Sequence, residues 1–197
     1  IFTTDKMLIT QLFGPQYVTQ YEVVFKLFSL VGFAHGLISA PLWSAYTDAY
    51  HRGDISWVRK MLVRQLLIFF AVLICVLILV AFSNELLDLW LGSDLGAPVS
   101  LVWALALLAT VSVWNNIFGF VLGGLGKVRL GSIYTCFTAV LNIPVSYFFS
   151  IHMGFGLSGI VYGTVASIAI SSILSPVQVF YFIFFEGKSR ALDLIFR

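Results

Sequence analysis

Residues 63–83 read VRQLLIFFAVLICVLILVAFS, and this stretch decides the fold class. Arg64 is its only charged residue, and as a helix the stretch is long enough to cross a hydrocarbon core that takes about 20 residues. In lipid, every backbone polar group must be bonded within the protein, so a spanning segment is either a helix or a strand of a closed barrel. Barrel strands alternate polar and apolar residues, and these residues do not alternate. The stretch therefore predicts a transmembrane helix.

The rest of the chain has the same apolar character. Hydrophobic residues make up 60% of the 197 residues and charged residues only 10%, whereas soluble domains carry about 25% charged residues. The stretch 63–83 is one of a series of apolar runs, so we expect an all-α membrane protein, a bundle of about six transmembrane helices. The other runs are 1–13, which reads as truncated, 17–46, 99–122, 130–151 and 157–185. Because the chain begins at Ile1 inside an apolar run, without a signal-peptide pattern, we expect a fragment whose N-terminal part is missing.

The distribution of Lys and Arg predicts the orientation of the helices. Outside the apolar interiors these residues fall in three segments, 52–64, 127–129 and 188–197. The positive-inside rule assigns such segments to the cytoplasm. The polar stretches that contain no Lys or Arg are 14–16, 84–98 and 152–156. Because the two kinds of stretch alternate along the chain, the alternation also supports the predicted number of helices.

Four ionisable residues lie inside the first two apolar runs. Counted inward from the turn at residues 14–15, Asp5 and Lys6 lie ~12–13 Å deep, and Glu22 and Lys26 lie ~8 and ~14 Å deep. The half-thickness of the hydrocarbon core is ~15 Å, so the four share a level near the midplane. A charge that faces lipid at the centre of a helix costs at least ~2.5–3.5 kcal/mol. We therefore expect these groups to face a wet cavity or one another.

The cluster has two interpretations. In the functional one, Lys6 and Lys26 bind an anionic group of a substrate, and Asp5 or Glu22 is the site of a coupling ion, since intramembrane charge commonly marks a transport pathway. In the structural one, Glu22 and Lys26 neutralise each other as an i, i+4 pair. Two amides inside later runs, Asn115 and Asn142, are further candidates for lining the cavity, although interhelical hydrogen bonding explains them equally well.

The small residues of the last apolar run indicate close helix packing. Gly159, Gly163, Thr164 and Ser167 recur at near-helical spacing, a pattern that lets helix backbones approach each other in membranes.

The sequence gives little support for an enzyme. The chain contains no Gly-rich phosphate loop, paired-carboxylate metal motif or Ser/His/Asp arrangement, so we predict no catalytic residue, no metal and no cofactor.

Five stretches match one transporter family in their order and spacing. The first combines an Asp-bearing helix, a turn and a Tyr-bearing helix, and the second is a Pro-containing helix end followed by a Gly-Asp turn. The stretches are TTDKMLITQLFGPQYVTQYEVVFKLFSL (3–30), APLWSAYTDAYHRGDISWVRK (40–60), VLGGLGKVRLGSIY (121–134), LNIPVSYFF (141–149) and GLSGIVYGT (156–164). Together they resemble the O-antigen and polysaccharide flippases of the multidrug/oligosaccharidyl-lipid/polysaccharide exporter superfamily.

This resemblance implies a two-bundle protein in the cell inner membrane, with residues 1–197 as its C-terminal transmembrane bundle and an N-terminal bundle that is missing here. Such proteins flip undecaprenyl-diphosphate-linked oligosaccharides by alternating access, for the biosynthesis of O-antigen and other polysaccharides. The partners implied are the lipid-linked oligosaccharide, membrane lipids and the missing N-terminal bundle, with no nucleic acid. The alternatives are a drug or metabolite exporter of the same superfamily and, from a different class, a membrane enzyme of glycan assembly.

Overall fold

The computed structural model describes residues 2–91 and 97–185, and within these residues all regular structure is helical. Five helical segments are long and apolar enough to cross a membrane, judged by length and composition. They are α2 (Gln16–His51), α3 (Ile55–Ala81), α5 (Val99–Gly124), α6 (Arg129–Tyr147) with the π-helix η1 (Phe148–His152), and α7 (Gly156–Phe185). The prediction of an all-α membrane bundle is confirmed.

Two short helices account for the remaining differences from the expected segments. The first apolar run forms α1 (Phe2–Leu12), whose 11 residues extend only about 16 Å and do not cross the bilayer alone. The second short helix, α4 (Ser83–Leu91), lies in a stretch that was expected to be a loop. Glu85 in its first turn favours a helix there, because acidic side chains stabilise helix N-termini.

Residues 63–81 of the stretch that decided the fold class lie within α3, and its last residue, Ser83, begins α4. The helix α3 begins at Ile55, directly after Asp54, whose carboxylate accepts hydrogen bonds from the Trp57 backbone N–H (3.0 Å) and the Ser56 hydroxyl (2.8 Å). Gly53, with φ +72°, ends the preceding turn, and Asp54 is the N-cap of α3. The first turns of α3 belong to the same unbroken helix as the transmembrane run.

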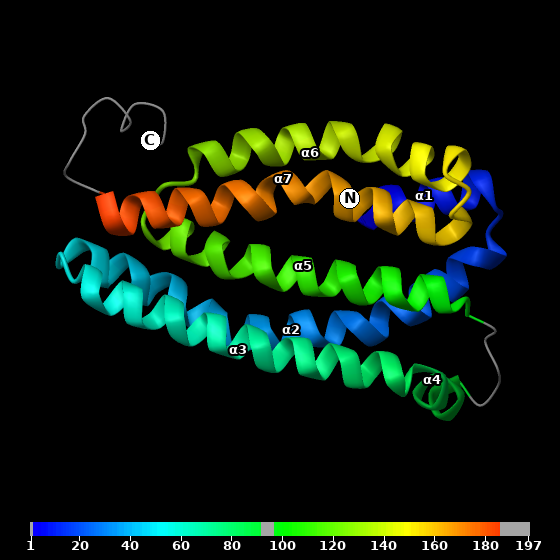
Figure 1. The fold of residues 1–197 in the computed structure, drawn as a ribbon, viewed down its shortest axis with the longest axis horizontal. Helices are drawn as coiled ribbons and strands as arrows, with labels where there is room; N and C mark the ends of the chain where they lie inside the picture. Colours follow the sequence, from blue (N-terminus) through cyan, green and yellow to red (C-terminus); the bar gives the residue numbers. More distant parts are fainter. Residues whose placement is uncertain (1, 92–96, 186–197) are drawn as a thin grey trace.

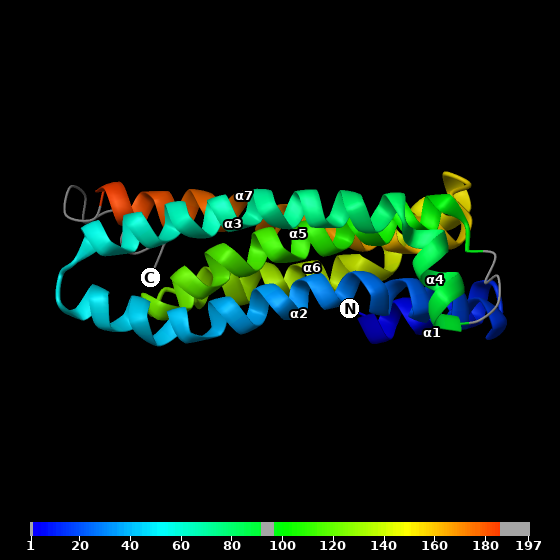
Figure 2. The ribbon, with the colours of Figure 1, turned by 90° about the horizontal axis from the view of Figure 1, so that it is seen from below.

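The helices form an elongated bundle in which α5 occupies the centre. It packs against α2, α3 and α7, while α6 lies along α7 on the far side (Figure 1). The short helix α1 contacts α2, α6 and α7 at one end of the bundle (Figure 2). The turns α2–α3 and α5–α6 and the end of α7 lie at the opposite end, on the left of Figure 1. Two predicted basic segments, 52–64 and 127–129, therefore lie at one end, as the orientation argument requires; the third, 188–197, lies outside the described residues.

The apolar interior is divided into two clusters, one toward each end of the bundle. One gathers residues of α1, α2, α5 and α7 around Tyr21 and Leu105, and the other gathers residues of α2, α3, α5 and α7 around Tyr46 and Phe118. The aliphatic residue Val72 packs partly against both.

Glycines bring α6 and α7 into backbone contact. A Cβ atom added at Gly163 would lie 2.3 Å from the Ser146 Cα, and one added at Gly159 would lie 2.5 Å from the Ser150 Cα. The close packing predicted from the small residues of the last run is confirmed.

Candidate functional site

The α1–α2 hairpin positions the charged residues of the predicted cluster. The N–H groups of Phe13 and Gly14 both donate to the Ile9 carbonyl (2.9 and 3.1 Å), and Gly14 takes φ +106°, a conformation that glycine adopts readily at a helix end. Pro15 then precedes α2 with φ −65°, which suits the start of a helix. The turn folds α1 back along the first part of α2, so that residues near 5 and near 22 face each other.

Lys6 and Glu22 form an ion pair across this hairpin. The two side chains are 40% and 24% exposed, so the pair lies at the surface of the bundle and is not enclosed in it. Lys6 also lines an open groove of about 370 Å³ along α1, together with Thr3 and Thr10. The pairing of Glu22 with Lys26, the structural interpretation of the cluster, is not the one that forms: Glu22 pairs with Lys6 instead.

Lys26 lies one helical turn deeper on α2 than Glu22, with its side chain exposed. Within the described ranges 2–91 and 97–185, no carboxylate lies within ion-pair distance of its amine. The residue count from the turn predicts a depth near the midplane for this position, where an isolated charge is costly.

Asp5 points in the opposite direction from Lys6 and is completely buried. Its Oδ1 accepts a hydrogen bond from the Thr164 hydroxyl at 2.9 Å, and its Oδ2 accepts a longer one, at 3.4 Å, from the Tyr21 hydroxyl. Both donors are neutral, and in the part of the chain that the structure describes no Lys or Arg forms an ion pair with this carboxylate. A buried carboxylate with only neutral partners is a costly arrangement unless it binds a proton or a cation.

The network extends beyond Asp5 to a fourth helix. The Asn142 Nδ2 group donates to Thr164 Oγ1 at 2.8 Å, so that Asn142, Thr164 and Asp5 form a directed chain of hydrogen bonds from α6 through α7 to α1. Asn142 is 1% exposed, and its Oδ1 has no hydrogen-bond partner among the described residues. One predicted candidate, Asn142, is therefore joined to another, Asp5, through a threonine.

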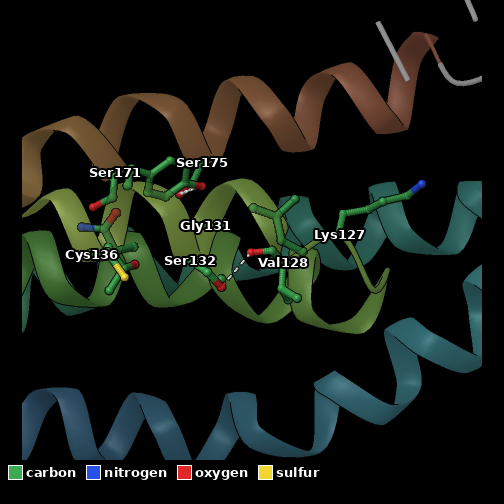
Figure 3. Close-up of a pocket in the computed structure, with 12 residues that line it drawn as sticks. Lys127, Val128, Gly131, Ser132, Cys136, Ser171 and Ser175 are labelled. Carbon is green, nitrogen blue, oxygen red and sulfur yellow. Dashed lines mark hydrogen bonds between the residues drawn. The ribbon is translucent and has the colours of Figure 1, made fainter. Parts of the chain in front are cut away.

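Asn115 lies apart from this network, nearer the basic end of the bundle. Its Nδ2 donates to the Ser172 hydroxyl (2.8 Å) and to the Val111 carbonyl (3.1 Å), which ties α5 to α7. It also lines a cavity of about 450 Å³ between α5, α6 and α7 (Figure 3). Small polar residues such as Ser132 and Ser171 line the same cavity, and Lys127 lies at its basic end. Asn115 thus combines the two alternatives, since it bonds between helices and also lines a cavity.

Sequence reasoning missed the two residues that hold the Asp5 carboxylate. Tyr21 had no signal beyond its position beside Glu22, and Thr164 was interpreted only as a small packing residue. The glycine next to Thr164 explains its role, because Gly163 draws α7 onto α6 and so brings the Thr164 hydroxyl to Asn142. A polar residue beside a close-packing glycine is the sequence signal that points to such a bond.

The apolar helices define a multi-pass membrane protein, and the comparisons with known proteins show its similarity to two proteins named for transport or export. The chain is 24% identical over 174 residues to an O-antigen transporter of Salmonella typhimurium. It is 21% identical over 173 residues to an O-antigen export protein of Yersinia pseudotuberculosis. Each match covers 87% of this chain. The predicted resemblance to O-antigen flippases and the predicted location in the bacterial inner membrane are confirmed by these similarities.

The chain covers less than half the length of each of these two relatives. The chain spans 40% of the length of the first relative and 39% of the second. No family model matches the chain, and no solved structure matches it.

Proposed function

We propose that this chain is the C-terminal bundle of a flippase that moves a lipid-linked, undecaprenyl-diphosphate-type oligosaccharide across the inner membrane for O-antigen synthesis. The observation that carries the proposal is the group of ionisable side chains near mid-depth on the α1–α2 hairpin, with Lys26 exposed there. The names of the two relatives support a glycan-related substrate. The lipid tail stays in the bilayer while the polar head group crosses along this face.

In the proposed mechanism Lys26 and Lys6 bind the diphosphate at different stages. Lys26 has no carboxylate partner among the described residues, so it attracts the anion first. Lys6 is held by Glu22 until the diphosphate arrives and competes with that carboxylate for the amine. Phosphate oxygens and carboxylates accept the same charge-assisted hydrogen bonds, so the diphosphate can take the place of Glu22 as the partner of the Lys6 amine. The head group is therefore bound without an unpaired lysine being left behind.

Asp5 is the better candidate for the coupling ion, in preference to Glu22. Glu22 already has a cationic partner, whereas Asp5 is buried among neutral donors. Binding and release of a proton or a cation at Asp5 would change the charge at a point where α1, α2, α6 and α7 meet. Such a change biases the arrangement of these helices, which alternating access requires.

The test of the substrate site is surface O-antigen on cells that express the full-length protein as Lys6→Ala, Lys26→Ala or the double variant. Each single change should reduce surface glycan, the double change most, because the diphosphate loses its cationic partners. Arg129→Ala is the matched control, since this exposed residue lies at the basic end of the bundle, away from the hairpin. Normal export by the double variant, at normal membrane levels, contradicts the proposal.

The coupling assignment has its own comparison. Asp5→Asn keeps the shape and removes the charge, and it should abolish export, whereas Glu22→Gln should retain a substantial fraction. The reverse order of effects would move the coupling site to Glu22. A purified protein that makes or cleaves a glycosidic bond would refute transport in favour of an enzyme.

A further inference from the structure

A basic groove lies at the start of α3, far from the hairpin that carries the proposed substrate site. It has a volume of about 360 Å³ and is lined by Arg59, Lys60, Val63 and Arg64. Lys60 and Arg64 are spaced i, i+4 and therefore lie on one face of the helix. The start of α3 and the helix α1 lie toward opposite ends of the bundle (Figure 1).

Arg59 is fixed in position by the end of α7. Its Nη2 donates to the Ile183 carbonyl at 2.8 Å, and its guanidinium carbon lies 4.5 Å from the centre of the Phe184 ring. Carbonyls in the last turn of a helix have no partner within the helix, so this hydrogen bond satisfies one of them. A guanidinium has five N–H donors, and the bond to Ile183 uses only one side of the group. Arg59 is thus a preformed donor at the edge of the groove.

Two acidic residues that the structure describes near this end, Asp48 and Asp54, are engaged elsewhere. Asp48 pairs with Arg52 at 2.9 Å, and Asp54 caps α3. The backbone N–H of Trp57 and the Ser56 hydroxyl hold the pKa of Asp54 below its usual value, so this carboxyl stays ionised as a cap. Across residues 2–91 and 97–185, neither Lys60 nor Arg64 forms an ion pair. The groove therefore keeps a net positive charge.

An apolar stripe continues from the groove along α3. Val63, Leu67, Phe70 and Ile74 follow one another at helical spacing and are 56–63% exposed. From Val63 to Ile74 the stripe extends about 16 Å at 1.5 Å per residue, which matches the ~15 Å half-thickness of a hydrocarbon core. Phosphate donors followed by an apolar strip of this length are complementary to a phospholipid, with its head group at the groove and its acyl chain along the helix.

We propose that this surface of α3 is a binding site for an anionic phospholipid of the leaflet at the basic end of the bundle. Lys60 and Arg64 bind the phosphate from the helix face, and the free side of the Arg59 guanidinium binds it from the edge. The acyl chain lies along Leu67, Phe70 and Ile74. Basic residues near the membrane surface attract anionic lipids by about 1 kcal/mol each, so the head-group contacts are sufficient for selection over zwitterionic lipids.

The experiment compares lipid retention by the full-length protein in detergent, measured by native mass spectrometry after equilibration with phosphatidylglycerol or phosphatidylcholine. Lys60→Gln/Arg64→Gln should retain phosphatidylglycerol about 20- to 30-fold less well, which follows from two contacts of about 1 kcal/mol each. Arg52→Gln/Arg129→Gln removes the same charge at the same end of the bundle and should have little effect. Equal losses in the two double variants would reduce the effect to general charge and overturn the site.

Two further variants distinguish binding of the whole lipid from binding of its phosphate alone, and distinguish loss of binding from misfolding. Leu67→Ala/Phe70→Ala should weaken retention of the lipid, since the acyl contacts are lost. Unchanged retention in that variant, or displacement of the lipid by millimolar inorganic phosphate, would show a simple phosphate site and contradict the proposal. The conservative exchange Lys60→Arg/Arg64→Lys should retain the lipid, and its failure to do so would also count against the proposal.

Discussion

Asp5 and Lys6 are neighbours in the chain whose side chains have opposite environments. Successive residues of a helix are about 100° apart around its axis, so one side chain can point inward while the next points outward. Lys6 reaches Glu22 at the surface, and Asp5 reaches Thr164 in the interior. A single turn of α1 thus contributes to two separate features, an exposed ion pair and a buried carboxylate.

Replacing Thr164 tests the buried network at the scale of one hydroxyl. Thr164→Val keeps the shape of the side chain but removes the donor to Asp5 and the acceptor of Asn142. Buried polar groups without partners cost about 1–3 kcal/mol, so thermal unfolding in detergent should occur at a lower temperature. Thr164→Ser, which keeps the hydroxyl, is the control. Equal stability of the Val variant and the unmodified protein would contradict the hydrogen-bond chain.

Asp54 gives a prediction for pH dependence. Its pKa is lowered in the folded protein, chiefly by the Trp57 backbone N–H. A carboxyl with a lowered pKa stabilises the fold above its unfolded pKa of about 3.9, and this contribution is lost as the pH falls through the folded value. As the pH is lowered below about 4, the temperature of unfolding should therefore decrease. The decrease should be smaller in Asp54→Asn, whose side chain still caps the helix. Identical pH profiles of the unmodified protein and Asp54→Asn would contradict the role of Asp54 in this pH dependence.

The sequence predicted that charged residues of α1 and α2 lie at a similar level, but it did not predict their individual contacts. Counting residues from the turn at 14–15 placed Asp5, Lys6 and Glu22 at one level, and two of these form the ion pair. The direction of each side chain depends on the rotation of α1, which is set by its packing on α2, α6 and α7. The spacing of Thr3, Lys6 and Thr10 indicates the outward face of α1, but the contact of Asp5 with Thr164 could not be predicted because it depends on how α7 packs.

At the scale of the helices, the lengths of the apolar runs gave the main elements. The run 157–185 corresponds to α7 and the run 99–122 to α5, each within about two residues. The α4 helix was missed because its nine residues are too few to cross a membrane, so they did not stand out among the long apolar runs even though the stretch is amphipathic. The length of a membrane-spanning helix can be predicted from hydrophobicity alone. A short helix such as α4 is stabilised by the residues that it packs against, here through the buried Leu87.

The glycine contact between α6 and α7 is testable by adding one methyl group. Gly163→Ala would place a Cβ 2.3 Å from the Ser146 Cα, and because the obstacle is backbone, the helices must separate. We expect a loss of stability of about 1–3 kcal/mol, typical of overpacking. Gly36→Ala in α2, where a Cβ meets nothing within 4 Å, is the control and should be neutral or slightly stabilising. Thermal unfolding of both variants in detergent measures the difference, and equal unfolding temperatures would contradict the prediction.

For the whole molecule, the orientation in the membrane is open to direct measurement. Ser56 lies in the first turn of α3 and Met153 directly after η1, two positions that belong to opposite ends of the bundle (Figure 1). Each is replaced by a single cysteine in a full-length background without other cysteines, in which Cys75 and Cys136 are serine. A membrane-impermeant maleimide added to cells with a permeabilised outer membrane should label residue 153 and leave residue 56 unlabelled. Labelling of residue 56 alone would invert the topology, and the assignment of the basic end to the cytoplasm would be wrong.

The division of the apolar interior into two clusters has a mechanical consequence. Each end of the bundle is held together by its own set of contacts, and the two sets share little besides Val72. If the helices separate at one end of the bundle, the apolar contacts at the other end can therefore stay in place. We expect any opening of the bundle to hinge between the two clusters, near the Asn115–Ser172 hydrogen bond, because one hydrogen bond can be exchanged for another at small cost.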